Sequence, residues 1–303
     1  MNKRRILLLG ADGQVGWQLR RTLLPLGEVL GCGRAQADLT QLDALHDLLN
    51  EHRPALIVNA AAYTAVDRAE SEADLAQRVN AEAPELCARW AASNDAWLVH
   101  YSTDYVFDGR LAHAYDETCE PSPLSVYGRT KLAGERAIVH SGCRHLIFRT
   151  SWVYALRGSN FAHTMLRLGR EREHLRVVAD QNGAPTSADL IADVTALALH
   201  RVLESPDFAA EAQGLYHLSA AGSTSWHGYA QYLLDQAAGQ GVELRCKQIA
   251  PIATADYPLP APRPANSRLD CSRLCERFDL TLPDWRVQVA RFVAEAVQVR
   301  HAA

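Results

Sequence analysis

Residues 6–16 read ILLLGADGQVG, an apolar run that ends in a turn with glycines at positions 10, 13 and 16. The run is typical of a buried strand, and Val15–Leu24 has the apolar spacing of a helix. Glycines let a backbone turn sharply and approach a phosphate closely, while the free N–H groups at a helix N-terminus favour negative charge. The stretch therefore predicts a strand–turn–helix unit that holds the pyrophosphate of a dinucleotide.

The chain beyond this turn alternates short apolar runs with helical segments. Strands that alternate with helices indicate parallel βαβ units, and burial on both faces explains runs that are continuously apolar. We predict a doubly wound parallel sheet of the Rossmann type over residues 1–150, and a smaller, mainly substrate-binding domain over 151–303, of which about 175–210 returns to the sheet. The predicted strands are Ile6–Gly10, Glu28–Cys32, Leu56–Ala60, Trp97–Tyr101 and Leu146–Thr150, and the predicted helices include Leu42–Leu49, Phe161–Arg172, Ala188–Leu203 and Trp226–Gln240.

Length, charge and cysteine content narrow the class of protein. The chain has 303 residues and a formal net charge of −4 at pH 7, so it has no basic surplus for nucleic acid or an anionic membrane. No apolar stretch reaches the roughly 18 residues that a transmembrane helix needs. The seven cysteines are scattered without a CxxC motif, which is typical of reduced thiols. We expect a cytoplasmic protein without nucleic-acid or membrane partners.

The residues after the second predicted strand bear on the choice of nicotinamide cofactor. Gly33 and Arg34 directly follow Cys32, and neither of them is a carboxylate. A carboxylate at this place binds the adenosine ribose hydroxyl of NAD, whereas an arginine accommodates the 2′-phosphate of NADP. We therefore predict NADPH as the preferred cofactor, with NADH as the alternative. A solvated surface charge is the other interpretation of Arg34.

Three side chains predict the chemistry. Tyr127 and Lys131 are four residues apart at the start of a predicted helix, so they lie on one face. A nearby ammonium favours a phenolate and can lower a tyrosine pKa by roughly one to three units. Such a tyrosine is suited to donate a proton to a forming alkoxide. Thr103 follows a strand end, where its hydroxyl is placed to hold the same oxygen. Together with the glycine turn, this set predicts the reduction of a ketone.

Seven stretches carry a resemblance to a known family: GADGQVG at 10–16, VNAAAYTAVDRAESE at 58–72, HYSTDYVFDG at 100–109, YGRTKLAGE at 127–135, FRTSWVY at 148–154, DQNGAPT at 180–186 and RPANSRL at 263–269. As a set they resemble the motifs of the extended short-chain dehydrogenase/reductases. Their individual residues are similar to those of the dTDP-4-dehydrorhamnose reductase family. The resemblance implies NADPH- or NADH-dependent reduction of the C4 ketone of dTDP-4-dehydro-β-L-rhamnose. The product would be dTDP-L-rhamnose, a precursor of cell-surface polysaccharide.

The resemblance also assigns roles to individual positions. It makes Tyr127 the proton donor and Lys131 its partner, which also orients the nicotinamide ribose. The implied cofactor contacts are Gly10, Gly13, Gln14, Val15 and Gly16 in the turn, Asp38 and Leu39 at the adenine, Ala62, Tyr63 and Thr64 beneath the cofactor, and Tyr101 beside it. The implied substrate contacts are Thr103 and Asp104 at the reacting sugar, Trp152 as an aromatic wall, and Arg263 and Arg268 toward the nucleotide diphosphate.

Some members of this family hold Mg²⁺ between subunits with carboxylates. One of those positions matches Gln18 here, and a neutral amide is a poorer ligand for a hard dication. Asp189 and Glu295 match the other positions. We therefore assign no metal ligands in this chain and keep Mg²⁺ as an alternative only, and we expect a homodimer.

Four other functions share much of this pattern. A nucleotide-sugar dehydratase typically carries Thr-Asp-Glu, whereas Tyr105 follows Thr103 and Asp104 here. An epimerase, or a reductase of another nucleotide-linked sugar, has overlapping motifs, and net consumption of the cofactor separates an epimerase from a reductase. A non-catalytic regulatory subunit, similar to the β-subunit of methionine adenosyltransferase, also resembles this family. The intact Thr103, Tyr127 and Lys131 favour catalysis over that alternative.

Overall fold

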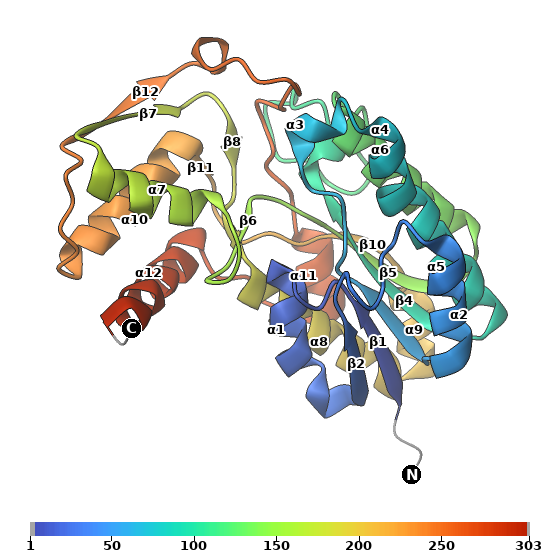
Figure 1. Cartoon of the computed structure of the whole chain (residues 1–303). Helices are drawn as coiled ribbons and strands as arrows, with labels where there is room; N and C mark the ends of the chain where they lie inside the picture. The colour runs from blue at the N-terminus through green and yellow to red at the C-terminus, as the bar shows by residue number, and fades with distance from the viewer. Residues whose placement is uncertain (1–3, 302–303) are drawn as a thin grey trace.

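The computed structural model describes residues 4–301 and has a parallel sheet at its centre (Figure 1). Six strands pair in the order β10–β5–β4–β3–β1–β2, and every neighbouring pair is parallel. The chain runs outward from β1 in both directions, so the strand order reverses between β1 and β3. The strands are β1 (Arg5–Leu9), β2 (Glu28–Cys32), β3 (Leu56–Asn59), β4 (Trp97–Thr103), β5 (Arg144–Thr150) and β10 (Gly214–His217). The predicted doubly wound α/β fold is confirmed.

The alternation of side chains along β1 explains why its apolar run is continuous. Ile6 and Leu8 belong to one hydrophobic core and Leu7 and Leu9 to another. Because successive side chains of a strand point to opposite faces, each face of the sheet needs its own apolar set. All four side chains are at most 1% exposed. The centre of the sheet is therefore buried on both faces.

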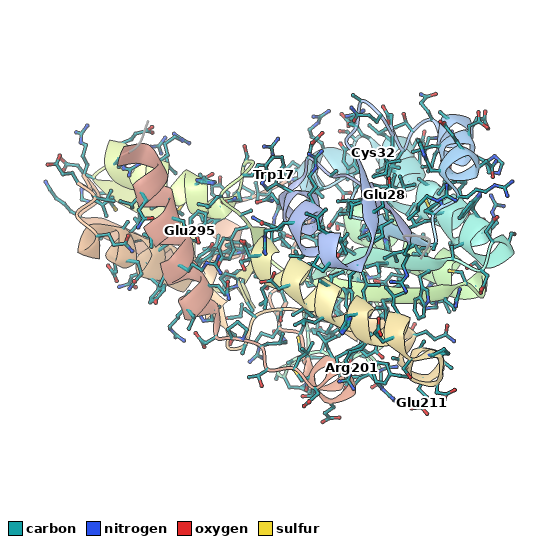
Figure 2. The ribbon with its side chains drawn as sticks, turned by 90° about the horizontal axis from the view of Figure 1, so that it is seen from below. Trp17, Glu28, Cys32, Arg201, Glu211 and Glu295 are labelled. Atoms are coloured by element: carbon teal, nitrogen blue, oxygen red, sulfur yellow. The ribbon has the colours of Figure 1, made fainter. Side chains whose placement is uncertain are left out.

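Helices cover both faces of the sheet (Figure 1). Residues of α1 and α8 share the core that contains Ile6, whereas residues of α2, α5 and α6 share the other core. Figure 2 shows α8 running across the underside, from the region of α12, which carries Glu295, to the end where Arg201 and Glu211 lie. The helices around the sheet are α1 (Gln14–Thr22), α2 (Leu42–His52), α3 (Val66–Ala69), α4 (Ala73–Gln77), α5 (Ala83–Ser93), α6 (Val126–His140), α8 (Ala188–Glu204), α9 (Pro206–Ala212) and α11 (Ser272–Phe278).

A smaller group of elements lies beside the sheet (Figure 1). It contains three helices and a parallel pair of strands, in which β7 hydrogen-bonds to β12. Two further short pairs, β8 with β11 and β6 with β9, complete it. The elements are α7 (Phe161–Glu171), α10 (Trp226–Gly239), α12 (Trp285–His301), β6 (Val153–Tyr154), β7 (His174–Val178), β8 (Asn182–Gly183), β9 (Thr186–Ser187), β11 (Thr224–Ser225) and β12 (Gln248–Ile252).

The chain crosses between the two groups more than once. Both α8 and β10 return to the sheet, whereas β7 stays with the smaller group. The division at residue 150 stays a prediction. Among the helices of residues 4–301, none combines the length and apolar character needed to span a bilayer.

Candidate active site

A cavity of about 920 Å³ opens at the carboxyl ends of β1, β3 and β4. It lies beside the point where the strand order reverses, which is where ligands bind in open parallel sheets. Its far wall comes from the smaller group of elements. The predicted residues that line it are Gly10, Gly13, Gln14, Val15, Arg34, Asp38, Leu39, Ala62, Tyr63, Thr64, Tyr101, Thr103, Asp104, Tyr127, Lys131 and Trp152. Gly16, Arg263 and Arg268 lie outside the lining.

The glycine turn is built by close approach of backbone to backbone. Gly10 has a φ of +74°, and a Cβ there would lie 2.6 Å from the backbone nitrogen of Ala61. A Cβ on Gly16 would lie 2.0 Å from the carbonyl oxygen of Gly10, so this glycine lets α1 close onto the turn. No side chain caps the N-terminus of α1. Its free N–H groups and partial positive charge therefore suit a pyrophosphate.

Arg34 and Asp38 stand at the rim of the cavity beyond β2. The Arg34 side chain is 81% exposed, and its Nε lies 3.4 Å from Asp38 Oδ2. Asp38 Oδ1 accepts hydrogen bonds from the Thr40 backbone nitrogen, at 2.9 Å, and from the Thr40 hydroxyl, at 2.8 Å. These bonds hold the pKa of Asp38 below its usual value. Asp38 is thus fixed by the backbone, and the exposed guanidinium is free to turn toward an anionic ligand.

The loop beneath the cofactor position is held by a segment that the sequence analysis missed. Residues Arg78–Glu82 form a π-helix, and Asn80 projects from it. The Tyr63 backbone nitrogen donates to Asn80 Oδ1 at 2.8 Å, and Asn80 Nδ2 donates to the Tyr63 carbonyl and to the Thr130 hydroxyl of α6. Asn80 therefore ties the loop to the helix that carries Tyr127. Short π-helical turns are common at functional sites, but no simple sequence pattern marks them.

Tyr127 and Lys131 both lie in the first turns of α6. Ser125 caps this helix by accepting a hydrogen bond from the Gly128 backbone nitrogen at 3.2 Å. The Lys131 side chain is buried, and its Nζ donates to the Tyr101 carbonyl at 2.6 Å and contacts His100 Nε2 at 3.0 Å. Burial lowers the pKa of Lys131 to about 8. The Lys131 side chain is therefore held firmly in place, and its pKa lies close to neutral pH.

That Lys131 lowers the pKa of Tyr127 stays a prediction, because burial dominates the pKa of this phenol in the structure. Burial raises the pKa of Tyr127 to about 12, and a hydrogen bond with Thr103 opposes this rise. Lys131 does not offset the burial because its amine is directed at Tyr101 and His100. Tyr127 therefore carries its proton at neutral pH, which is the state that a proton donor needs.

Thr103 and Asp104 come together at the carboxyl end of β4. The Thr103 hydroxyl donates to Asp104 Oδ1 at 2.9 Å and accepts from the Tyr105 backbone nitrogen at 3.1 Å. Asp104 is 3% exposed. Burial raises the pKa of its carboxyl to about 6. Both side chains line the same cavity as Tyr127, and their contact with the reacting sugar stays a prediction.

Trp152 is part of an aromatic wall that faces the sheet across the cavity. Its ring stacks on Trp226 with centroids 3.6 Å apart and planes 10° from parallel. Its backbone is left-handed, with a φ of +47°, and a Cβ at Gly183 would collide with its indole ring. Phe161 and Tyr229 also line the cavity. The sequence analysis missed these partners of Trp152, because their approach depends on contacts between distant segments.

The two predicted diphosphate contacts are engaged elsewhere. Arg263 forms a two-pronged ion pair with Asp67, at 3.0 and 2.8 Å. The Arg268 guanidinium donates to Asn266 Oδ1 and to the Ala112 carbonyl. Both arginines thus fasten the segment before α11 to other loops. Their guanidinium groups are occupied by these partners rather than facing the cavity.

The candidate positions for a shared metal also have other partners. Glu295 Oε1 accepts from Arg291 Nε at 2.8 Å. Asp189 lies close enough to Arg291 and Glu295 for their charges to act on its carboxyl, whose pKa is raised mainly by burial. Within residues 4–301, no group of three or more His, Cys, Asp or Glu side chains is placed to hold a metal ion. We assign no chemical step to a metal.

The fold and the cavity together define an extended short-chain dehydrogenase/reductase. The sequence profile of the RmlD substrate binding domain matches residues 4–298. The chain is 48% identical to the dTDP-4-dehydrorhamnose reductase of Salmonella typhimurium, over 96% of this chain and 97% of that protein. It is 47% identical to the enzyme of the same name from Burkholderia thailandensis, over 96% and 98% of the two chains.

A solved structure agrees with these sequence comparisons. The dTDP-4-dehydrorhamnose reductase of Bacillus anthracis, in complex with NADP, superposes with a TM-score of 0.86. The two chains are 34% identical, and the match covers 97% of this chain and all of the other. This chain belongs to the dTDP-4-dehydrorhamnose reductase family.

Proposed function

We propose that this chain uses NADPH to reduce the C4 ketone of dTDP-4-dehydro-β-L-rhamnose, which yields dTDP-L-rhamnose. One observation carries this proposal: Tyr127, Lys131 and Thr103 line the same cavity as the glycine turn at the end of β1. A proton donor, its basic partner and a second hydroxyl thus stand beside a pyrophosphate site. The identity to named reductases over nearly the whole chain supports this choice of sugar.

The residues of the cavity fit a reduced dinucleotide. The uncapped N-terminus of α1 would hold the pyrophosphate, and the exposed Arg34 would meet the 2′-phosphate. The NADP bound to the Bacillus anthracis relative supports this choice of cofactor. Bound NADPH supplies the hydride to the ketone carbon.

The side chains at the carboxyl end of β4 handle the proton. Tyr127 donates its proton to the ketone oxygen, and the Thr103 hydroxyl turns from Asp104 to donate its single hydrogen bond to the same oxygen, which stabilises the charge that develops there. Lys131, as an ammonium, favours the phenolate that Tyr127 becomes. In the structure Asp104 accepts this hydroxyl proton at 2.9 Å, so it holds Thr103 in place until the hydroxyl turns to the ketone oxygen. Trp152 forms the opposite wall, against which the sugar ring would rest.

Tyr127→Phe tests the proton donor. We expect its turnover to fall by a factor on the order of 10² or more, because the phenol is lost while the ring remains. The assay follows NADPH absorbance with dTDP-4-dehydro-β-L-rhamnose, which a 3,5-epimerase supplies in the reaction. Tyr115→Phe is the matched control. Tyr115 is buried and stacks on Phe107, with the two ring centroids 4.2 Å apart, and it lies outside the cavity. Near-normal turnover of Tyr127→Phe would remove Tyr127 from the mechanism.

The regulatory-subunit alternative makes a different prediction. A binding partner of that kind would bind the cofactor but oxidise none of it, with any 4-keto sugar. We favour the enzyme because the cavity holds the complete set of Thr103, Tyr127 and Lys131. We further propose that the enzyme acts in the cytoplasm, since each of its seven cysteines is a free thiol. A homodimer stays a prediction, which sedimentation of the purified chain measures.

A further inference from the structure

His100 is a polar residue in the middle of a buried strand. It lies on β4 within the run WLVHYST, and its side chain is fully buried. Its register partner on β3 is Asn59. Its ring contacts Lys131 Nζ through Nε2, at 3.0 Å, and Asn59 Nδ2 through Nδ1, at 3.2 Å. Burial of a polar ring costs stability unless the ring forms hydrogen bonds, so these two contacts decide how His100 is tolerated in the core.

The hydrogen bonds of Asn59 decide which ring nitrogen of His100 carries the proton. The Ala61 backbone nitrogen donates to Asn59 Oδ1 at 3.1 Å, so the amide oxygen faces that loop and the NH₂ group faces the imidazole. Nδ1 of His100 must therefore accept a hydrogen bond. Burial is the largest cause that lowers the pKa of His100 well below its usual value, so the ring is neutral. A neutral ring that accepts at Nδ1 carries its proton on Nε2.

This tautomer determines what the ring can offer Lys131. A proton on His100 Nε2 points at Lys131 Nζ, so Nζ must offer a lone pair to accept this hydrogen bond. An amine has one, whereas an ammonium has only protons to present. We propose that His100 is a positioning residue which holds Lys131 against the Tyr101 carbonyl and favours its amine form over its ammonium form. This inference rests on the proposed function, in which Lys131 is the partner of Tyr127.

Other charged and titratable groups near Lys131 are also accounted for. Glu135 lies one helical turn further along α6 and favours the ammonium. Its carboxylate is shared with Arg149, whose Nε and Nη2 lie 3.0 and 2.6 Å from it, and with the Ser102 hydroxyl. Tyr127 lies one turn earlier, and it carries its proton at neutral pH. None of these groups contacts Asn59, so a change at Asn59 leaves them in place.

Asn59→Asp reverses the predicted tautomer with little change in shape. A carboxylate accepts from both the Ala61 nitrogen and a proton on Nδ1, which leaves Nε2 free to accept from an ammonium. Nitrogen NMR of ¹⁵N-labelled histidine reports which ring nitrogen is protonated, and His100→Gln identifies the signal by its loss. We expect the Nε2–H tautomer in the wild type and the Nδ1–H tautomer in Asn59→Asp. An Nδ1–H tautomer of His100 in the wild type would overturn the inference.

The pH profile of kcat/KM gives a second readout. Loss of the ammonium weakens the stabilisation of the Tyr127 phenolate, so activity falls as the pH rises through the pKa of Lys131. We expect Asn59→Asp to move this alkaline limb upward by roughly one pH unit. His217→Gln is the matched control, because His217 is as deeply buried on β10 but bonds to the Tyr115 carbonyl instead. An unmoved limb in Asn59→Asp contradicts the inference. Absence of turnover in the wild type contradicts the proposed function, while the NMR reading still decides the tautomer.

Discussion

A single methyl group at Gly16 tests how closely α1 meets the glycine turn. In Gly16→Ala, an ideal Cβ would lie 2.0 Å from the Gly10 carbonyl oxygen and 2.7 Å from its carbon. The optimum for such non-bonded atoms is roughly 3.5 Å, so the helix and the turn must separate by more than about 1 Å. Both partners are backbone and cannot rotate away. Overpacking of this kind costs about 3 kcal/mol, which corresponds to a fall in Tm of roughly 6 °C.

The same displacement affects the cofactor. It moves the free N–H groups of α1 away from the pyrophosphate, and we expect NADPH to bind about 10-fold more weakly, a loss of roughly 1.4 kcal/mol. Circular dichroism on heating and a fluorescence titration with NADPH measure the two effects. Gly239→Ala is the control: this exposed glycine ends α10, and a Cβ there meets nothing within 4 Å. Wild-type Tm and NADPH affinity in Gly16→Ala would refute the close contact.

Two further predictions concern charged groups in the cavity. Arg34→Ala should weaken NADPH binding about 10-fold while NADH binding stays unchanged, because only NADPH carries the 2′-phosphate; equal effects on the two cofactors would make Arg34 a surface charge. Asp104→Asn should show a pH-dependent gain in stability. The folded pKa of Asp104, about 6, lies above its unfolded value of roughly 3.9, so its favourable contribution is complete below pH 4 and lost as the pH rises through 6. Unfolding in urea should therefore show Asp104→Asn gaining about 3 kcal/mol over the wild type at pH 7 and almost nothing near pH 4; a constant difference would contradict the raised pKa.

Local patterns in the sequence predicted the sheet well. The runs at Glu28–Cys32 and Leu56–Ala60 match β2 and β3 to within one residue. For β3 the reason is that a strand buried on both faces must be continuously apolar. The glycine turn was predictable for a related reason, since only residues without a Cβ fit where backbones nearly touch. The order of the strands depends on pairings between distant segments, and no local pattern specifies it.

In the candidate site, too, local relations between residues were predictable from the sequence and contacts between distant segments were not. Tyr127 and Lys131 were predictable because their relation is local, four residues apart on one helix. The burial that raises the pKa of Tyr127 was not, because it depends on everything packed around α6. The pairing of Arg263 with Asp67 was missed for the same reason: the two residues lie 196 positions apart in the chain. His100 had a visible signal, a histidine in an otherwise apolar strand, but its contact with Lys131 appears only in the fold.

The stoichiometry of the reaction tests the central claim most directly. Purified wild-type chain is mixed with NADPH and dTDP-4-dehydro-β-L-rhamnose, generated by the 3,5-epimerase, and both NADP and the sugar product are quantified. A reductase oxidises one NADPH for each dTDP-L-rhamnose formed, and this is the result we predict. Conversion of the sugar without net oxidation would indicate an epimerase, and binding of NADPH without any conversion would contradict the assignment of this chain as the reductase of this sugar.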